Sequence, residues 1–269
     1  MTNDLRMRSA AALDAQARRL RELHEPGNPV VLANIWDAAS AWLAETAGFA
    51  AVATSSGAVA ESLGYADHEG APAEEMFAAA GRIASSVSVP VTVDAESGYQ
   101  LPAQRFVERL LASGAVGCNL EDTDHRTGRL AELAEQVAWL SDVRAAADEA
   151  GVGLVINARI DVFLQAYATS SKPDERALLG AALRRADAYL NAGADCVYPI
   201  LARQPDTIEG FVAGVDRRAV NIAYLRDGLN PASLGDLGVA RVSLGTGLWR
   251  ATQAWLTDQL TTLAEGRSW

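Results

Sequence analysis

Cysteine and long apolar runs are both scarce in this chain. Its 269 residues include two cysteines, Cys118 and Cys196, and both lie inside apolar, strand-like stretches. Such positions predict buried free thiols rather than a disulfide or a metal-binding pair. No apolar run reaches the length of about 20 residues that a membrane-spanning helix needs. The segment Met1–Arg6 also lacks the apolar core of a secretory signal, so we expect a cytoplasmic protein.

Positively charged residues are also few in this chain. The chain has 23 Lys and Arg residues against 34 Asp and Glu residues, which gives a net charge of −11 and a pI near 4.8. This balance argues against a nucleic acid or an anionic membrane as partner. Hydrophobic residues make up 49% of the chain, which is ample material for a sizeable core.

A weak internal repeat organises the chain. A helical stretch ends in a small residue and glycine, and a short apolar run follows. Glycine after a helix adopts the left-handed cap conformation cheaply and turns the chain into the next strand. The pattern predicts strands at residues 49–54, 115–120, 152–158, 194–198 and 239–244, and similar apolar runs add 30–34, 89–94 and 219–223.

The intervening segments are predicted to be helical. They cover residues 37–47, 73–85, 102–113, 130–150, 174–192 and 205–213, after an amphipathic N-terminal helical extension within residues 1–24. Alternating strands and helices with continuously apolar strands indicate a parallel sheet. Eight such units in one chain of this length predict an α/β fold, a (β/α)8 TIM barrel with parallel strands. The rival is an open doubly wound sheet, but no Gly-x-Gly-x-x-Gly follows the first strand. No linker divides residues 1–269, so we expect a single domain.

Carboxylates gather where the predicted strands end. Asp94 ends one apolar run, Glu96 follows it, Glu121 ends another, and Asp67 lies in a preceding loop. Uncompensated, such charges repel and raise one another's pKa. A hard cation held by oxygen removes the conflict, and Mg2+ suits a few carboxylates and water. These four residues are therefore the predicted metal site.

Other polar groups fall at the same end of the predicted barrel, which is where TIM barrels place their active sites. Arg159 follows the fifth strand, opposite the acidic groups, and Trp36 follows the first. A metal beside a guanidinium suits an anionic substrate. The alternative for Arg159 is a structural ion pair with Glu121. An aspartate after a strand also serves as a helix N-cap, and that simpler interpretation is preferred for Asp37, Asp122 and Asp161.

Six strings resemble the isocitrate lyase/phosphoenolpyruvate mutase superfamily. They run in order between about Asn34 and Gly193 and are Asn34-Ile-Trp-Asp-Ala-Ala-Ser-Ala, Glu45-Thr-Ala-Gly-Phe, Ser55-Ser-Gly-Ala, Asp94-Ala-Glu-Ser-Gly-Tyr, Asn119-Leu-Glu-Asp and Asn157-Ala-Arg-Ile-Asp. The resemblance implies a Mg2+-dependent barrel, with Mn2+ as substitute, that makes or breaks a C–C or P–C bond next to a carboxylate through enolate-like intermediates.

The resemblance also implies roles for particular residues. Asp94 would touch the metal and the substrate region, while Asp67, Glu96 and Glu121 would hold the metal's waters. The backbone N–H groups of Ser56, Gly57 and Ala58 would bind the substrate carboxylate, and Arg159 would pair with its charge. Family barrels usually swap their last helix between subunits, which implies a homodimer or homotetramer, and Trp249, Trp255 and Trp269 in the tail would serve that purpose.

The loop after Glu121 departs from the family pattern. Lyases of the superfamily carry a Lys-(Lys/Arg)-Cys-Gly-His signature there, and mutases a Lys and an Asn, whereas this chain has Asp122-Thr-Asp-His-Arg-Thr-Gly-Arg. Protonation by that cysteine is excluded. His125 becomes the candidate proton donor, on a loop expected to close over the site. The alternative for this loop is a solvated turn.

Two functional classes stay open. One is a Mg2+-dependent lyase or phosphonomutase-like enzyme with Glu121, His125 and Arg159 as catalytic residues. Its substrate would be a small 2-oxo- or 2-hydroxycarboxylic acid, a dicarboxylate or phosphonocarboxylate smaller than isocitrate. The other is a ligand-binding or catalytically vestigial barrel that keeps the metal without a proton donor.

Overall fold

Eight parallel strands close into a barrel, as the sequence predicts. The computed structural model describes residues 9–216 and 218–268. The barrel strands are β2 (Asn28–Ile35), β3 (Val52–Thr54), β4 (Val91–Asp94), β5 (Gly117–Glu121), β8 (Val155–Ile160), β9 (Cys196–Pro199), β10 (Ala219–Ala223) and β11 (Arg241–Ser243). Each pairs in parallel with its neighbour, and pairing of β2 with both β3 and β11 closes the ring. A short strand, β1 (His24–Glu25), is added antiparallel to β2.

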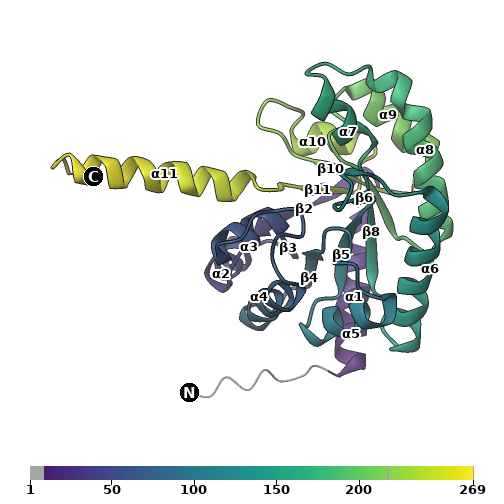
Figure 1. Cartoon of the computed structure of the whole chain (residues 1–269), viewed down its shortest axis with the longest axis horizontal. Coiled ribbons are helices and arrows are strands. Elements are labelled where there is room, and N and C mark those ends of the chain that lie inside the picture. The colour runs from purple at the N-terminus through teal and green to yellow at the C-terminus, as the bar shows by residue number, and fades with distance from the viewer. Residues whose placement is uncertain (1–8, 217, 269) are drawn as a thin grey trace.

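Most of the helices surround the barrel (Figure 1). The helices of the described chain are α1 (Ala10–Glu22), α2 (Ala38–Thr46), α3 (Ser56–Leu63), α4 (Ala73–Ser86), α5 (Ala103–Ala112), α6 (Leu133–Glu149), α7 (Val162–Thr169), α8 (Glu175–Asn191), α9 (Pro205–Gly214), α10 (Pro231–Asp236) and α11 (Gly247–Ala264). The apolar core lies between strands and helices, where Phe106, Leu110, Leu140 and Tyr189 are fully buried. Both cysteines are buried free thiols, as expected.

One end of the barrel is closed by α1 and the other carries the polar strand ends. The buried face of α1, with Leu13, Ala17 and Leu20, packs against residues at the start of the strands, including Val155. Residues 1–8 of the predicted N-terminal extension lie outside the described residues. No helix of the described chain is both long and apolar enough to cross a membrane.

The prediction was wrong about the segment after β5. The helix expected from residue 130 begins at Leu133, because Arg129–Leu130 forms strand β7 and pairs antiparallel with β6 (Thr123–Asp124). This two-stranded hairpin carries His125 at its turn. Three short helices at strand ends, α3, α7 and α10, were also missed.

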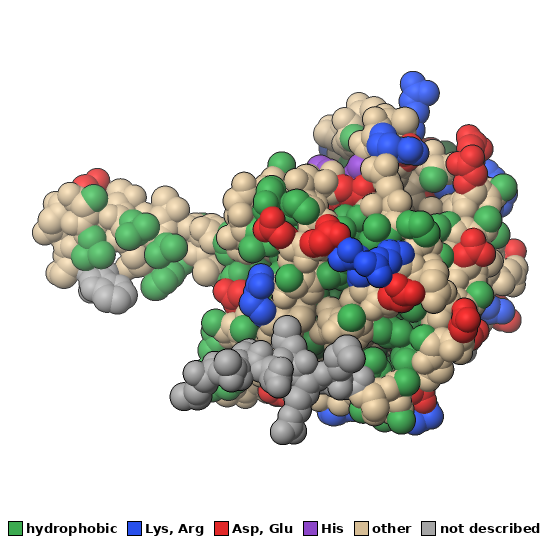
Figure 2. Space-filling view, turned by 60° about the horizontal axis from the view of Figure 1, so that its bottom comes forward, with side chains coloured by type: hydrophobic (Ala, Val, Ile, Leu, Met, Phe, Trp, Pro, Cys, Tyr) green, Lys and Arg blue, Asp and Glu red, His purple; other side chains and the backbone are tan. Residues whose placement is uncertain are grey.

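The last helix leaves the barrel. In Figure 1, α11 extends away from the other helices, and none of its described residues is buried. Its apolar side chains therefore face solvent, and Figure 2 shows such side chains on the projecting arm. The exposed large ones are Leu248, Trp255, Leu256, Leu260 and Leu263. On the barrel, α2 exposes Trp42 and Leu43 in the same way.

Candidate functional site

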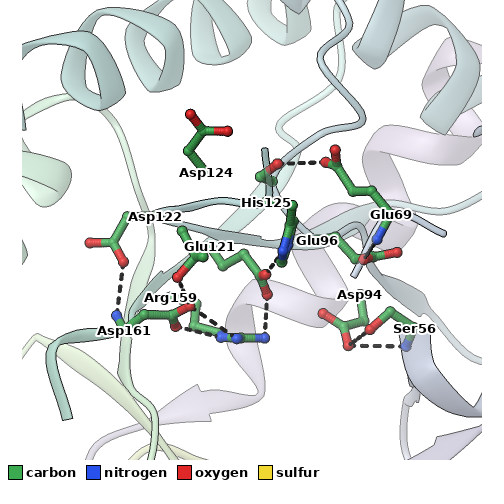
Figure 3. A network of polar contacts seen from close by, with 12 residues as sticks. Ser56, Glu69, Asp94, Glu96, Glu121, Asp122, Asp124, His125, Arg159 and Asp161 are labelled. Carbon is green, nitrogen blue, oxygen red and sulfur yellow. Dashed lines mark hydrogen bonds and ion pairs between the residues drawn. The ribbon is translucent and has the colours of Figure 1, made fainter. Parts of the chain in front are cut away.

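Asp94 lies at the centre of the acidic strand ends, at the last position of β4. Its Oδ2 atom accepts hydrogen bonds from Ser56 N at 3.1 Å and Ser56 Oγ at 3.0 Å (Figure 3). Its own N–H donates to Thr54 Oγ1 at 2.9 Å. Asp94 is thus tied to the start of α3, and its second carboxylate oxygen is directed away from these contacts.

Glu96 is buried among acidic groups, and the pKa of its carboxyl group is raised. It is 2% exposed and has a left-handed backbone, with φ of 50°. Its Oε2 accepts the backbone N–H of Glu69, and Oε1 has no partner among the described residues. Burial, together with the charges of Asp94, Asp67 and Glu121, raises the pKa of Glu96 to about 8. The carboxyl is therefore largely protonated at neutral pH unless a cation compensates it.

Asp67 reaches the same place from the loop after α3, where it packs against Gly57. A Cβ atom at Gly57 would lie 2.7 Å from Asp67 Oδ2, so only glycine leaves room for the carboxylate. The other oxygen, Asp67 Oδ1, is buried and accepts no hydrogen bond from any described residue. Asp67 and Asp94 thus lie near enough to Glu96 for their charges to act on its carboxyl group.

We expect Gly57→Ala to displace Asp67 without unfolding the barrel. The added methyl group meets the end of a flexible side chain, which can move, rather than fixed backbone. The thermal midpoint should change little, while Mg2+ affinity measured by calorimetry should fall. Gly64→Ala is not a suitable control because its φ is 88°, so Ala60→Gly in α3 serves instead. Undiminished Mg2+ affinity in Gly57→Ala would remove Asp67 from the predicted metal site.

Glu121 forms the other half of the site with His125 and Arg159 (Figure 3). His125 Nε2 lies 2.5 Å from Glu121 Oε1, and Arg159 Nη1 pairs with Glu121 Oε2. Burial raises the pKa of Glu121 to about 7, although Arg159 and His125 act in the opposite direction. Burial alone would lower the pKa of His125, but its close contact with Glu121 and the other nearby carboxylates raise it overall. The pair can therefore hold a proton near neutral pH.

Asp161 binds a second edge of the Arg159 guanidinium. Arg159 Nε donates to Asp161 Oδ1 at 2.7 Å and Nη2 donates to Asp161 Oδ2 at 3.1 Å. The interpretation of Asp161 as a helix cap was therefore wrong, and its side chain makes no capping hydrogen bond to α7. Asp122 is not a cap either, because it accepts from Asp161 N, Tyr189 Oη and Arg185 Nη1. Only Asp37 behaves as predicted, in a capping box with Ser40.

The segment predicted to bind the substrate carboxylate begins α3. Ser56 N is engaged by Asp94, and Ala58 N points to Ser55 Oγ at 3.5 Å. Gly57 N belongs to the first turn, whose donors no helical carbonyl can reach. A helix N-terminus favours negative charge, so Gly57 N is the best-placed backbone donor of the three.

Two further elements border the acidic strand ends. The ring of Trp36, at the end of β2, lies 5.0 Å from that of Trp249 at the start of α11. The imidazole of His68, in the Asp67 loop, lies 5.3 Å from that of His125. This contact joins the loop to the β6–β7 hairpin. A cavity of about 300 Å³ opens between the hairpin and the loop after β4, with Gln100 and Trp139 in its lining.

Glu69 was missed by the sequence analysis. Its carboxylate Oε1 accepts from Ser97 Oγ and from Tyr99 N at 2.8 Å, and this holds the loop that carries Glu96. In the sequence, only the position of Glu69 between His68 and Gly70 points to a role for it. His68, Glu69, Tyr99 and Gln100 all have positive φ, so both loops are held in a conformation that side chains rarely adopt.

The chain is similar in sequence and in fold to proteins of one enzyme family. The family model for phosphoenolpyruvate phosphomutase matches residues 20–264. A chloroplastic carboxyvinyl-carboxyphosphonate phosphorylmutase from Arabidopsis thaliana is 31% identical and covers 97% of this chain and 79% of its own. A 2-methylisocitrate lyase from Escherichia coli K12 is 31% identical over 66% of this chain and 62% of that enzyme.

A solved structure shows the same fold at higher identity. The crystal structure of a putative phosphonomutase from Burkholderia cenocepacia J2315 superposes with a TM-score of 0.86 and is 37% identical. The match covers 93% of this chain and 99% of that one.

Proposed function

Because the chain belongs to the phosphoenolpyruvate phosphomutase family and is a carbon–carbon lyase or phosphonomutase-type enzyme, we propose that it cleaves a C–C or P–C bond in a Mg2+-dependent reaction. The bond lies next to the carboxylate of a small 2-oxo- or 2-hydroxycarboxylic acid. The observation that carries this proposal is the meeting of three buried or half-buried carboxylates at Asp94 with the Glu121–His125–Arg159 cluster.

The donor set fits a hydrated magnesium ion. Within residues 9–216 and 218–268, no three carboxylate, histidine or cysteine side chains are close enough to enclose a metal directly. Mg2+ does not require such a cage, since it keeps several waters and takes only one or two carboxylates. The unpartnered oxygens Asp67 Oδ1 and Glu96 Oε1 are acceptors for those waters. Asp94 would then be the direct ligand, with Glu121 as a further acceptor.

The metal would supply a Lewis acid for the negative charge that develops on the substrate oxygen. The protein would bind the substrate and supply the proton. Arg159 binds the substrate carboxylate through the N–H groups that its ion pairs leave free. His125 sits against Glu121 with a raised pKa, so it can deliver a proton to the carbon that loses its bond. Gly57 N donates to a second carboxylate at the start of α3.

The activity is tested directly with a panel of small acids. Substituted malates, oxaloacetate-like acids and phosphonopyruvate would be incubated with the protein and Mg2+, and the 2-oxo acid released would be measured. Release that needs Mg2+ and stops with a chelator supports the proposal. A protein that binds Mg2+ but turns over no acid in the panel would be the vestigial barrel instead.

The projecting helix suggests the quaternary structure. We propose that α11 packs on the α2 face of a second copy, forming a homodimer or a larger homo-oligomer. The exposed apolar residues of α11 and of α2 are the two halves of that contact. Of the three tail tryptophans expected to take part, Trp255 is 56% exposed, Trp249 instead contacts Trp36, and Trp269 lies outside the described residues.

We expect Leu256→Glu on α11 to shift the protein to monomer. A charge in an apolar interface must be desolvated, which costs several kcal/mol. Light scattering after size exclusion would give the mass in solution. Thr261→Glu, on the opposite face of α11, is the matched control and should leave the mass unchanged. A wild-type protein that is monomeric at micromolar concentration would contradict the proposal.

A further inference from the structure

The Arg159 guanidinium is already bound by two carboxylates of the protein, those of Asp161 and Glu121. A guanidinium carries five N–H groups in a fixed plane. Asp161 accepts two of them, from Nε at 2.7 Å and Nη2 at 3.1 Å, and Glu121 accepts a third from Nη1. One N–H remains on each terminal nitrogen. The free N–H of Nη2 lies on the end edge of the plane, where a guanidinium matches the oxygens of a planar carboxylate.

Asp161 itself is held by two residues besides Arg159. Thr123 Oγ1 donates to its Oδ2 at 2.6 Å, and its backbone N–H donates to Asp122 Oδ1 at 2.8 Å. Asp122 is held in turn by Tyr189 Oη at 2.7 Å and Arg185 Nη1 at 3.0 Å, both from α8. Asp161 and Asp122 are fully buried. Rigid supports of this kind fix a side chain within a narrow range of directions.

The same supports anchor the hairpin that carries His125. Thr123 begins β6, and Arg185 Nη2 donates to the carbonyl of Ala131, just after β7, at 2.9 Å. The N–H of Ala131 donates to the carbonyl of Asp122 at 2.8 Å. The residues that hold Asp161 beside Arg159 therefore also fix both ends of the β6–β7 hairpin. They are Thr123, and Asp122 with its partner Arg185.

We propose that Asp161 is a positioning residue for substrate binding: it occupies the side edge of the Arg159 guanidinium so that only the end edge faces an incoming carboxylate. This role rests on the proposed function, and it goes beyond it by assigning a task to a residue whose sequence position indicates only a helix cap. Asp161 acts through Arg159 and does not touch the substrate.

The role is tested first without substrate. In the wild-type protein, nitrogen-15 spectra should show separate signals for the two terminal nitrogens of Arg159, because Asp161 and Glu121 block rotation of the guanidinium. Asp161→Asn removes the charge and one acceptor, so these signals should broaden or merge. Thr123→Val keeps the charge and volume but removes one support of Asp161, and it should give a smaller change in the same direction. Two resolved signals in Asp161→Asn would overturn the proposal.

The second test uses turnover of the acid that the panel identifies. Loss of a charge-assisted hydrogen bond should raise KM by about tenfold to a hundredfold, with a smaller change in kcat. Arg159→Met should raise KM further, and adding Asp161→Asn to it should change KM no more, because the residue acts only through Arg159. Effects that add in full would contradict the proposal.

Glu175→Gln is the matched control. Glu175 is also a fully buried carboxylate, and it accepts from Tyr167 Oη at 2.7 Å and from two backbone N–H groups away from the site. This variant should lose stability without changing KM or the Arg159 signals. If the wild-type protein turns over no acid, the proposed function fails, and the Arg159 spectra still decide the role of Asp161.

Discussion

Asp94→Ala is expected to abolish Mg2+ binding and activity together while leaving the barrel folded. Asp94 is the one predicted direct ligand, and its neighbours Glu96, Asp67 and Glu121 contribute only through water. Its removal leaves no carboxylate at the end of β4. The hydrogen bonds from Ser56 are lost as well, at a cost of about 1 kcal/mol each, which a barrel of this size tolerates. Calorimetry with Mg2+ and a thermal melt measure both effects.

Asp37→Ala is the matched control for this variant. Asp37 also follows a barrel strand, but it serves as an N-cap, accepting from Ser40 N at 2.7 Å. Its loss should cost about 1 kcal/mol of stability and leave Mg2+ affinity intact. Undiminished Mg2+ binding by Asp94→Ala would show that the metal lies elsewhere.

His125→Gln is expected to lower kcat by about a hundredfold or more, the usual contribution of a general acid. Glutamine keeps a donor near Glu121 but cannot deliver a proton. Because the pKa of His125 is raised in the folded protein, the imidazolium persists to higher pH than in a free histidine. The wild-type rate should therefore fall as the pH rises through that raised pKa, and this alkaline limb should be absent from the variant.

His68→Gln controls for the loss of an imidazole at the same place, since the two rings are 5.3 Å apart. It should keep both the rate and the alkaline limb. If His125→Gln matched the wild type in rate and pH profile, His125 would be ruled out as proton donor and a metal-bound water would take its place.

The barrel was predictable because its signals are local. Each small residue–glycine step, such as Ser113-Gly114, ends a helix, and the apolar run after it has room for only one strand. Five of the eight barrel strands follow from this pattern, and the other three, β2, β4 and β10, follow from apolar runs alone. The β6–β7 hairpin has no such signal, since each of its strands has two residues and the segment resembles a turn.

Asp94 and Glu121 could be placed from the sequence because both stand at strand ends, and neighbouring parallel strands bring their ends together. Asp122 was misjudged because its side-chain partners, Arg185 and Tyr189, lie on α8. Asp161 was misjudged because no local pattern shows that its carboxylate binds Arg159 and Thr123 instead of capping α7. Glu69 was missed for the same reason, because its contacts with Ser97 and Tyr99 depend on two loops meeting in space.

The most direct test of the metal-dependent site is a crystal structure grown with Mn2+ and oxalate, using anomalous scattering to locate the metal. We predict one Mn2+ bound directly to Asp94, with waters bridging to Glu96, Asp67 and Glu121, and an oxalate carboxylate against the end edge of Arg159. A metal bound away from Asp94, or an oxalate that contacts neither the metal nor Arg159, would contradict the account.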